Sequence, residues 1–122
     1  MQRGRRLEPK AAALFARRTG TSVQETGLWK RELSGLPLAA SPDRMMVGQN
    51  AILEIKCPAK LAAVRDSTIV QATLQLLVTR RDVCWIVTYV PPALEIQQLF
   101  YDSDLAELLL LALEPIHAEL MR

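Results

Sequence analysis

The sequence predicts an α/β domain of the α+β type, in which a central mixed β-sheet is flanked by helices. Segments with helical spacing of apolar residues alternate along the chain with short β-branched and aromatic segments, which is typical of this class. Residues 83–90 are apolar almost without interruption, as in a strand at the centre of a sheet. Half of the 122 residues are apolar, which supports one core and excludes a disordered chain. We therefore expect one minimal domain spanning residues 1–122.

Three segments are predicted to be helices. Residues 7–18 carry apolar side chains at helical spacing and precede Gly20, a residue that commonly ends a helix. Residues 68–80 have a similar pattern. A last helix is expected to begin at a cap, Asp102 or Ser103, and to run nearly to the C-terminus.

The strands are expected between these helices. Residues 21–33 mix β-branched and polar residues and predict one or two strands with a turn, followed by a loop at 34–37. Residues 38–47 lead into and form a short strand, which a turn joins to a second strand at 51–56. A further strand is expected at 94–100, next to the central one.

Charge is distributed unevenly although the net charge is only +2. The C-terminal stretch is acidic, which favours one face for a polyanion and another turned away from it, with an ordinary uneven surface as the alternative. The last helix carries an apolar excess at Leu108–Leu111, for which we prefer core packing over an oligomer interface. The basic residues gather near the start of the chain: Arg3, Arg5, Arg6, Lys10, Arg17 and Arg18.

The chain shows no feature that directs it into or across a membrane. It lacks a run of about eighteen uncharged apolar residues, and its basic start is not followed by the apolar region of a signal peptide. Its two cysteines, Cys57 and Cys84, resemble buried residues of a reducing compartment. We expect an intracellular protein, cytoplasmic or nuclear.

The segment 51–56 brings an acid and a base to one face of a strand. Side chains alternate along a strand, so Glu54 and Lys56 point the same way, about 7 Å apart, while Ile55 points to the other side. Asp43, across the hairpin turn, is the natural third member. An Asp–Lys–Glu cluster exposed on a hairpin is the alternative interpretation.

Two carboxylates beside each other favour a divalent cation, because hard cations prefer carboxylate, carbonyl and water oxygens. We expect Mg²⁺, with Mn²⁺ as a substitute, to be held by Asp43, Glu54 and the backbone carbonyl of Ile55. Lys56 would favour hydroxide formation from a water and stabilise negative charge on a phosphate. This chemistry predicts phosphodiester hydrolysis.

Four segments in order resemble one known family. Residues 40–43 followed by 53–58 closely resemble the nuclease motif of the lambda-exonuclease and YqaJ-type viral recombinase nucleases, which belong to the PD-(D/E)XK superfamily. Residues 3–9 resemble the G-x-x-x-E-P helix of that family. Residues 71–79 resemble its helix with spaced glutamines, and residues 82–91 resemble its last strand before a proline. The resemblance implies a core like that of the restriction endonucleases.

The resemblance also implies roles for individual residues. Glu8 is implied as a supporting acid that orients a water or binds a second cation, and Gln71 as a residue that positions the attacking water or the DNA backbone. Plain helix surface is the alternative for both Gln71 and Gln75. The implied catalytic set is Glu8, Asp43, Glu54, Lys56 and Gln71. The implied metal ligands are Asp43, Glu54, Ile55 and Glu8. The residues expected to contact DNA are Arg3, Arg5, Arg44, Lys60 and Gln75.

The activity that follows from the resemblance is 5′→3′ digestion of double-stranded DNA during recombination, leaving a 5′-phosphate. The resemblance further implies a ring of three subunits and a single-strand annealing partner. Two alternatives stay open: a structure-specific or site-specific endonuclease of the same superfamily, and a DNA-binding or assembly module without useful catalysis. The chain starts almost at its first helix, which favours the module without useful catalysis and predicts a minimal nuclease core. The complete acid and lysine set argues against it.

Overall fold

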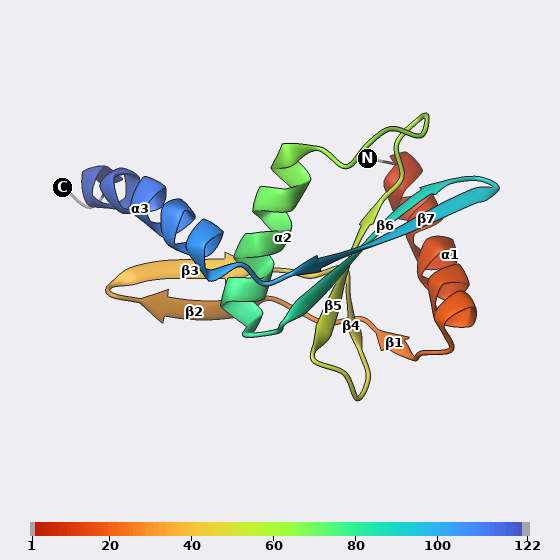
Figure 1. Ribbon diagram of the computed structural model, residues 1–122, viewed down its shortest axis with the longest axis horizontal. Coiled ribbons are helices and arrows are strands. Elements are labelled where there is room, and N and C mark those ends of the chain that lie inside the picture. Colours follow the sequence, from red (N-terminus) through yellow and green to blue (C-terminus); the bar gives the residue numbers. More distant parts are fainter. Residues whose placement is uncertain (1, 121–122) are drawn as a thin grey trace.

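The computed structural model describes the backbone of residues 2–120 and the side chains of residues 6–120. This part of the chain forms three helices, a five-stranded sheet and a separate two-stranded sheet (Figure 1). In chain order the elements are α1 (Gln2–Thr19), β1 (Val23–Gln24), β2 (Trp29–Leu33), β3 (Leu36–Ala40), β4 (Arg44–Met46), β5 (Ala51–Lys56), α2 (Asp66–Thr79), β6 (Val83–Val90), β7 (Ala93–Phe100) and α3 (Ser103–Leu120).

The main sheet is mixed, as the sequence predicts. Its strand order is β1-β4-β5-β6-β7, and only β5 and β6 run parallel to each other. A parallel pair needs a crossover, which α2 supplies between the two strands. The predicted bounds of β5 and β6 are those of the structure. The apolar segment 83–90 forms an interior strand, as expected, with β5 on one side and β7 on the other.

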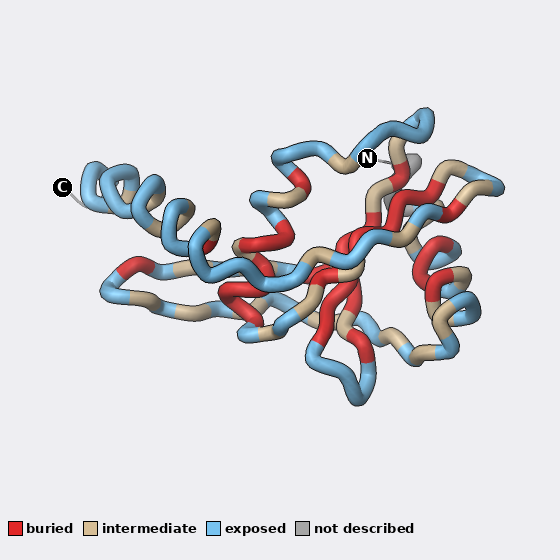
Figure 2. The backbone as a smooth tube through the Cα atoms, viewed as in Figure 1, coloured by how far each residue is buried: buried red, intermediate tan, exposed pale blue. Residues whose placement is uncertain are grey.

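The two faces of this sheet bury separate apolar clusters. On one face, Ala11 and Phe15 of α1 pack with Leu53 and Ile55 of β5. On the other face, α2 packs onto Ile52 and its neighbours. Figure 1 shows α1 and α2 on opposite sides of the strands, and Figure 2 shows the buried residues concentrated where these strands meet. Strand β5 is thus held from both sides and is a rigid base for any side chain that it carries.

The hairpin of β2 and β3 departs from the predicted loop at 34–37. The strands are joined by Ser34 and Gly35, which both have positive φ, at 49° and 80°. Two such residues form the tight turn that suits the twist of a hairpin. Pro37 therefore lies inside β3, paired with Glu32, where its missing N–H is tolerated because the sheet has only two strands.

The helix α3 is mostly exposed, which corrects the expectation that its leucines pack in the core. Leu108 is 64% exposed and Leu111 is 57% exposed, and Ala106 is the buried residue of this helix. Figures 1 and 2 show why: α3 leaves the sheet after β7 and extends away from it, with its far end in solvent. Its main contact with the rest of the described fold is with α2.

Two element bounds differ from the prediction in ways that concern the site. Helix α1 begins at Gln2, so Pro9 lies within it and not near its start. Asp43 was expected inside a strand but lies directly before β4. Within the described residues, no helix combines the length and the hydropathy needed to cross a bilayer.

Candidate active site

The strand β5 presents an acid and a base on the face that α2 covers. Glu54 and Lys56 lie two and four residues after Ile52 and therefore on the same face of β5, and Ile52 packs in the cluster on the α2 side. Leu53 and Ile55, which alternate with them, pack in the cluster on the α1 side, so the two faces of β5 are those that the sequence predicts. Glu54 is only 3% exposed, whereas Lys56, at the end of the strand, is partly exposed. A carboxylate with so little contact with water requires partners from the protein or a bound cation.

Asp43 is fixed to β5 at two points. Its backbone N–H donates to the carbonyl of Leu53 at 3.1 Å, which extends the β4–β5 ladder by one residue. Its carboxylate Oδ2 accepts a hydrogen bond from the backbone N–H of Ile55 at 2.6 Å. These two bonds bring the Asp43 carboxylate to the part of β5 that carries Glu54.

The carboxyl of Asp43 resists ionisation at this position. Burial raises the pKa of Asp43 most, and the Glu54 charge and a hydrogen bond between the two side chains raise it further, from 3.8 to about 7. The Ile55 N–H and the Lys56 charge lower it and offset only part of this effect. The positive charge of Lys56 therefore does not fully compensate the negative charge of the two acids. Carboxylate oxygens of Asp43 and Glu54, with the Ile55 carbonyl, are donors that suit Mg²⁺ or Mn²⁺.

Lys56 is held beside this pair by two oxygens. Its Nζ lies 3.5 Å from Glu54 Oε1 and donates a hydrogen bond to Gln71 Oε1 of α2 at 3.0 Å. Gln71 is itself exposed, so this end of the cluster is open to solvent. The structure thus brings together four of the predicted residues: Asp43, Glu54, Lys56 and Gln71.

Glu8 and Arg44 form a pair on the other side of β5. Arg44 pairs with Leu53 in the ladder and is 8% exposed. Its NH1 donates to Glu8 Oε1 at 2.7 Å and to the carbonyl of Asp43 at 2.6 Å. The family resemblance implies that Glu8 orients a water or binds a second cation, and Arg44 is expected to contact a phosphate. In the structure the two side chains form an ion pair with each other. Among the described residues, no group of three or more aspartate, glutamate, histidine or cysteine side chains is arranged to hold a metal ion.

Gln75 was expected to contact DNA, but the structure buries it. It is 4% exposed, and its Nε2 donates to Glu54 Oε2 at 2.5 Å. A side chain enclosed in this way does not reach a DNA surface. The burial follows from the orientation of α2, whose inner face carries Gln75 and packs against the sheet at β5 and β6.

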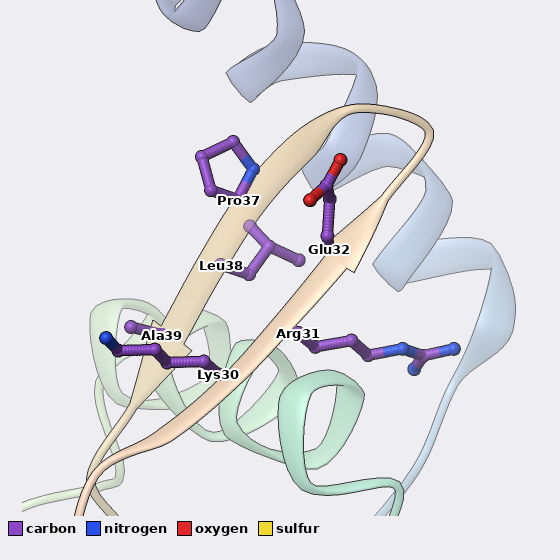
Figure 3. A pocket seen from close by; sticks show the side chains of 6 residues that line it. All are labelled: Lys30, Arg31, Glu32, Pro37, Leu38 and Ala39. Carbon is purple, nitrogen blue, oxygen red and sulfur yellow. The ribbon is translucent and has the colours of Figure 1, made fainter.

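The remaining predicted contacts lie outside the cluster. Lys60 is exposed in the connection between β5 and α2. Arg3 and Arg5 lie within α1, but the structure describes only their backbone. A surface pocket on the β2–β3 hairpin (Figure 3) contains none of the predicted site residues. The acid pair of Asp43 and Glu54, and not this open pocket, is the candidate chemical centre.

The inward orientation of Arg44 was missed, although the sequence holds a signal for it. The turn at 48–50 sets the register of the β4–β5 hairpin, which places Arg44 opposite Leu53 and on the α1 face. Glu8, on α1, is then the acid that its guanidinium meets. No comparable signal within the hairpin indicates the role of Gln75.

Comparison with known proteins finds a matching family and similar structures. A family model described as the YqaJ-like viral recombinase domain matches residues 1–81, which include every residue of the cluster. The alkaline exonuclease LHK-Exo from Laribacter hongkongensis has a similar structure, with a TM-score of 0.88 and 28% identity over 99% of this chain and 68% of that chain. Among curated proteins, no relative matches.

Two further solved structures are similar. LHK-Exo in complex with dAMP has a TM-score of 0.88 and 30% identity, again over 99% of this chain and 68% of that chain. A phage-related exonuclease from Haemophilus somnus 129PT has a TM-score of 0.68 and 14% identity, over 87% of this chain and 63% of that chain. The last likeness concerns the fold alone.

Proposed function

The chain belongs to the YqaJ-like viral recombinase domain family, and we propose that it is a metal-dependent nuclease that hydrolyses phosphodiester bonds in DNA. The observation that carries this proposal is the acid pair of Asp43 and Glu54 with Lys56 beside it. A pair of mutually repelling carboxylates, with Glu54 buried and Asp43 half-buried, opposes folding, so its presence is best explained by a cation that it serves to bind.

We propose that Mg²⁺, or Mn²⁺ in its place, is held by Asp43, Glu54 and the carbonyl of Ile55. When bound, such an ion supplies Lewis-acid stabilisation of phosphate charge and lowers the pKa of a water. The raised pKa of Asp43 fits this role, because a cation competes with the proton that this carboxyl otherwise retains. Glu8 supports the site through Arg44, whose guanidinium bonds to the Asp43 carbonyl.

Lys56 supplies the positive charge for the reaction. Its ammonium is held between Glu54 Oε1 and Gln71 Oε1, which limits the positions that it can adopt. From there it stabilises the negative charge that develops on the phosphate when water attacks. Water adds to phosphorus, the bond to the 3′ oxygen breaks, and that oxygen takes up a proton. The products are a 5′-phosphate and a 3′-hydroxyl.

The more specific proposal is a 5′→3′ exonuclease acting on double-stranded DNA in recombination. It is supported by the likeness to LHK-Exo, which is described as an alkaline exonuclease and has been solved with dAMP. A deoxynucleoside monophosphate is the product expected of an exonuclease. We also propose self-association, as in the three-subunit ring that the family resemblance implies, and a single-strand annealing partner. The exposed Leu108 and Leu111 of α3 support self-association.

The test is digestion of end-labelled linear DNA with Mg²⁺, with Mn²⁺ and with EDTA, alongside a covalently closed circle. We expect mononucleotides from the linear substrate, none from the circle, and none in EDTA. Lys56→Ala should lower the rate by at least about 100-fold. Lys30→Ala, which removes an exposed lysine of β2, is the matched control and should leave the rate unchanged. Cleavage of the circle would favour the endonuclease alternative.

A further inference from the structure

The helix α2 carries two amide side chains that meet the two charged residues of β5 one to one. Gln75 donates its Nε2 to Glu54, and Gln71 presents its Oε1 to Lys56. The direction of each amide suits its partner, because a carboxylate accepts only and an ammonium donates only. Of the two glutamines, Gln71 is exposed and Gln75 is buried.

The spacing explains why both contacts form at once. Four residues of a helix advance about 6 Å and two residues of a strand advance about 6.6 Å, so the two intervals match. The order is reversed between the elements, with Gln75 over Glu54 and Gln71 over Lys56. This reversal is expected of a crossover helix, which runs back along the strand that it follows. The spacing of Glu54 and Lys56 on β5 thus matches the spacing of Gln71 and Gln75 on α2, so both contacts form together.

The burial of Gln75 is costly for the fold. Its Oε1 is enclosed and has no hydrogen-bond partner among the described residues, although its Nε2 is satisfied. An apolar side chain of the same shape would avoid that cost. The neighbours of Gln75 on the inner face of α2, Ala72 and Leu76, are apolar in this way. An amide at this position is therefore explained by its action on Glu54 and not by packing.

We propose that Gln75 is a positioning residue that fixes the Glu54 carboxylate in the orientation in which it binds the metal, and that it makes no contact with DNA. The bond to Nε2 occupies Glu54 Oε2 and stops the carboxylate from rotating. Oε1 then remains on the side of Lys56, 3.5 Å from its Nζ. This inference rests on the proposed metal-dependent function of the same site.

The test compares Gln75→Met, which keeps the length of the side chain but loses the donor, with Thr73→Val as a matched control. Thr73 is also buried in α2, but its hydroxyl donates to the Ile69 carbonyl of its own helix. Calorimetric titration of Mn²⁺ without DNA gives the metal affinity. Fluorescence anisotropy with a labelled duplex in EDTA gives the DNA affinity.

We expect Gln75→Met to bind Mn²⁺ about 10- to 100-fold more weakly than the wild type, with unchanged DNA affinity. Thr73→Val should match the wild type in both measurements. Gln75→Asn keeps the amide on a shorter chain and should fall between wild type and Gln75→Met, which provides a second variant if Met disturbs folding. In a Glu54→Gln background, Gln75→Met should cause no further loss of Mn²⁺ affinity.

Several outcomes would overturn the inference. One is wild-type Mn²⁺ affinity in Gln75→Met, and another is a loss of DNA affinity in EDTA. Equal losses in Gln75→Met and Thr73→Val would assign the effect to helix packing. Failure of the proposed function is distinct, because the wild type itself would then neither bind Mn²⁺ nor cleave DNA.

Discussion

Replacing Asp43 with asparagine should stabilise the metal-free protein at pH 8. The folded state raises the pKa of this carboxyl from 3.8 to about 7, so the fold resists its ionisation. At about 1.36 kcal/mol for each pKa unit, this difference corresponds to about 4 kcal/mol. Solvent screening at a partly exposed side chain reduces the value, and we expect Asp43→Asn to raise the free energy of unfolding by about 1–3 kcal/mol.

The pH dependence has a definite sign. Between pH 3.8 and about 7 the folded state retains a proton that the unfolded chain loses, so stability falls as the pH rises through this window. The gain from Asp43→Asn should thus be largest at pH 8 and shrink toward pH 5. An asparagine Oδ1 can still accept the hydrogen bond from the Ile55 N–H, and its amide can donate to Glu54, so the local contacts are kept.

Urea denaturation in EDTA at pH 5 and pH 8 measures the effect directly. Glu107→Gln, a similar change at an exposed position of α3, is the matched control and should alter the free energy of unfolding by less than about 0.5 kcal/mol. Adding Mg²⁺ should stabilise the wild type and not Asp43→Asn. The reasoning is refuted if Asp43→Asn destabilises the metal-free protein at pH 8, or if its effect is the same at both pH values.

Three other predictions concern the surroundings of the site. Glu8→Gln leaves the buried Arg44 without its closest charged partner and should lower the free energy of unfolding by about 1–3 kcal/mol, measured in urea; a stability equal to wild type would show that this pair is unimportant. Burial raises the pKa of the Cys84 thiol to about 12, with a contribution from the nearby Glu54 charge, so iodoacetamide at pH 8 should label it only after unfolding, as mass spectrometry of the digested protein would report. Rapid labelling of Cys84 in the folded protein would contradict the buried position of its thiol. Leu108→Glu with Leu111→Glu should change the free energy of unfolding of the subunit little while shifting sedimentation toward smaller species, and an unchanged sedimentation coefficient would argue against α3 as the interface.

The sequence predicted the sheet that carries the site because its strands have strong local patterns. Alternation along 51–56 and the apolar run at 83–90 gave the bounds of β5 and β6 and the common face of Glu54 and Lys56. These patterns arise from each strand's own burial, so one segment at a time is enough to find them.

The rest depends on contacts between distant segments. Arg44 meets Glu8 across 36 residues, and Gln75 meets Glu54 across 21. The spacing of Gln71 and Gln75 showed that they share a helix face, but not how deeply each would be buried. Likewise, α3 has the composition of a core helix, and only the path of the chain after β7 leaves Leu108 and Leu111 exposed. Local patterns predict elements, whereas the partners of a buried charge come from the packing.

The central claim is that Asp43, Glu54 and Lys56 form a metal-dependent site for cleaving DNA. Its most direct test is the initial rate of nucleotide release from linear double-stranded DNA, measured in Mg²⁺ for the wild type and for Glu54→Gln. We predict release of 5′-mononucleotides by the wild type, abolition by EDTA, and a rate at least about 100-fold lower for Glu54→Gln. Cleavage by Glu54→Gln at the wild-type rate, or cleavage that persists in EDTA, would contradict the claim.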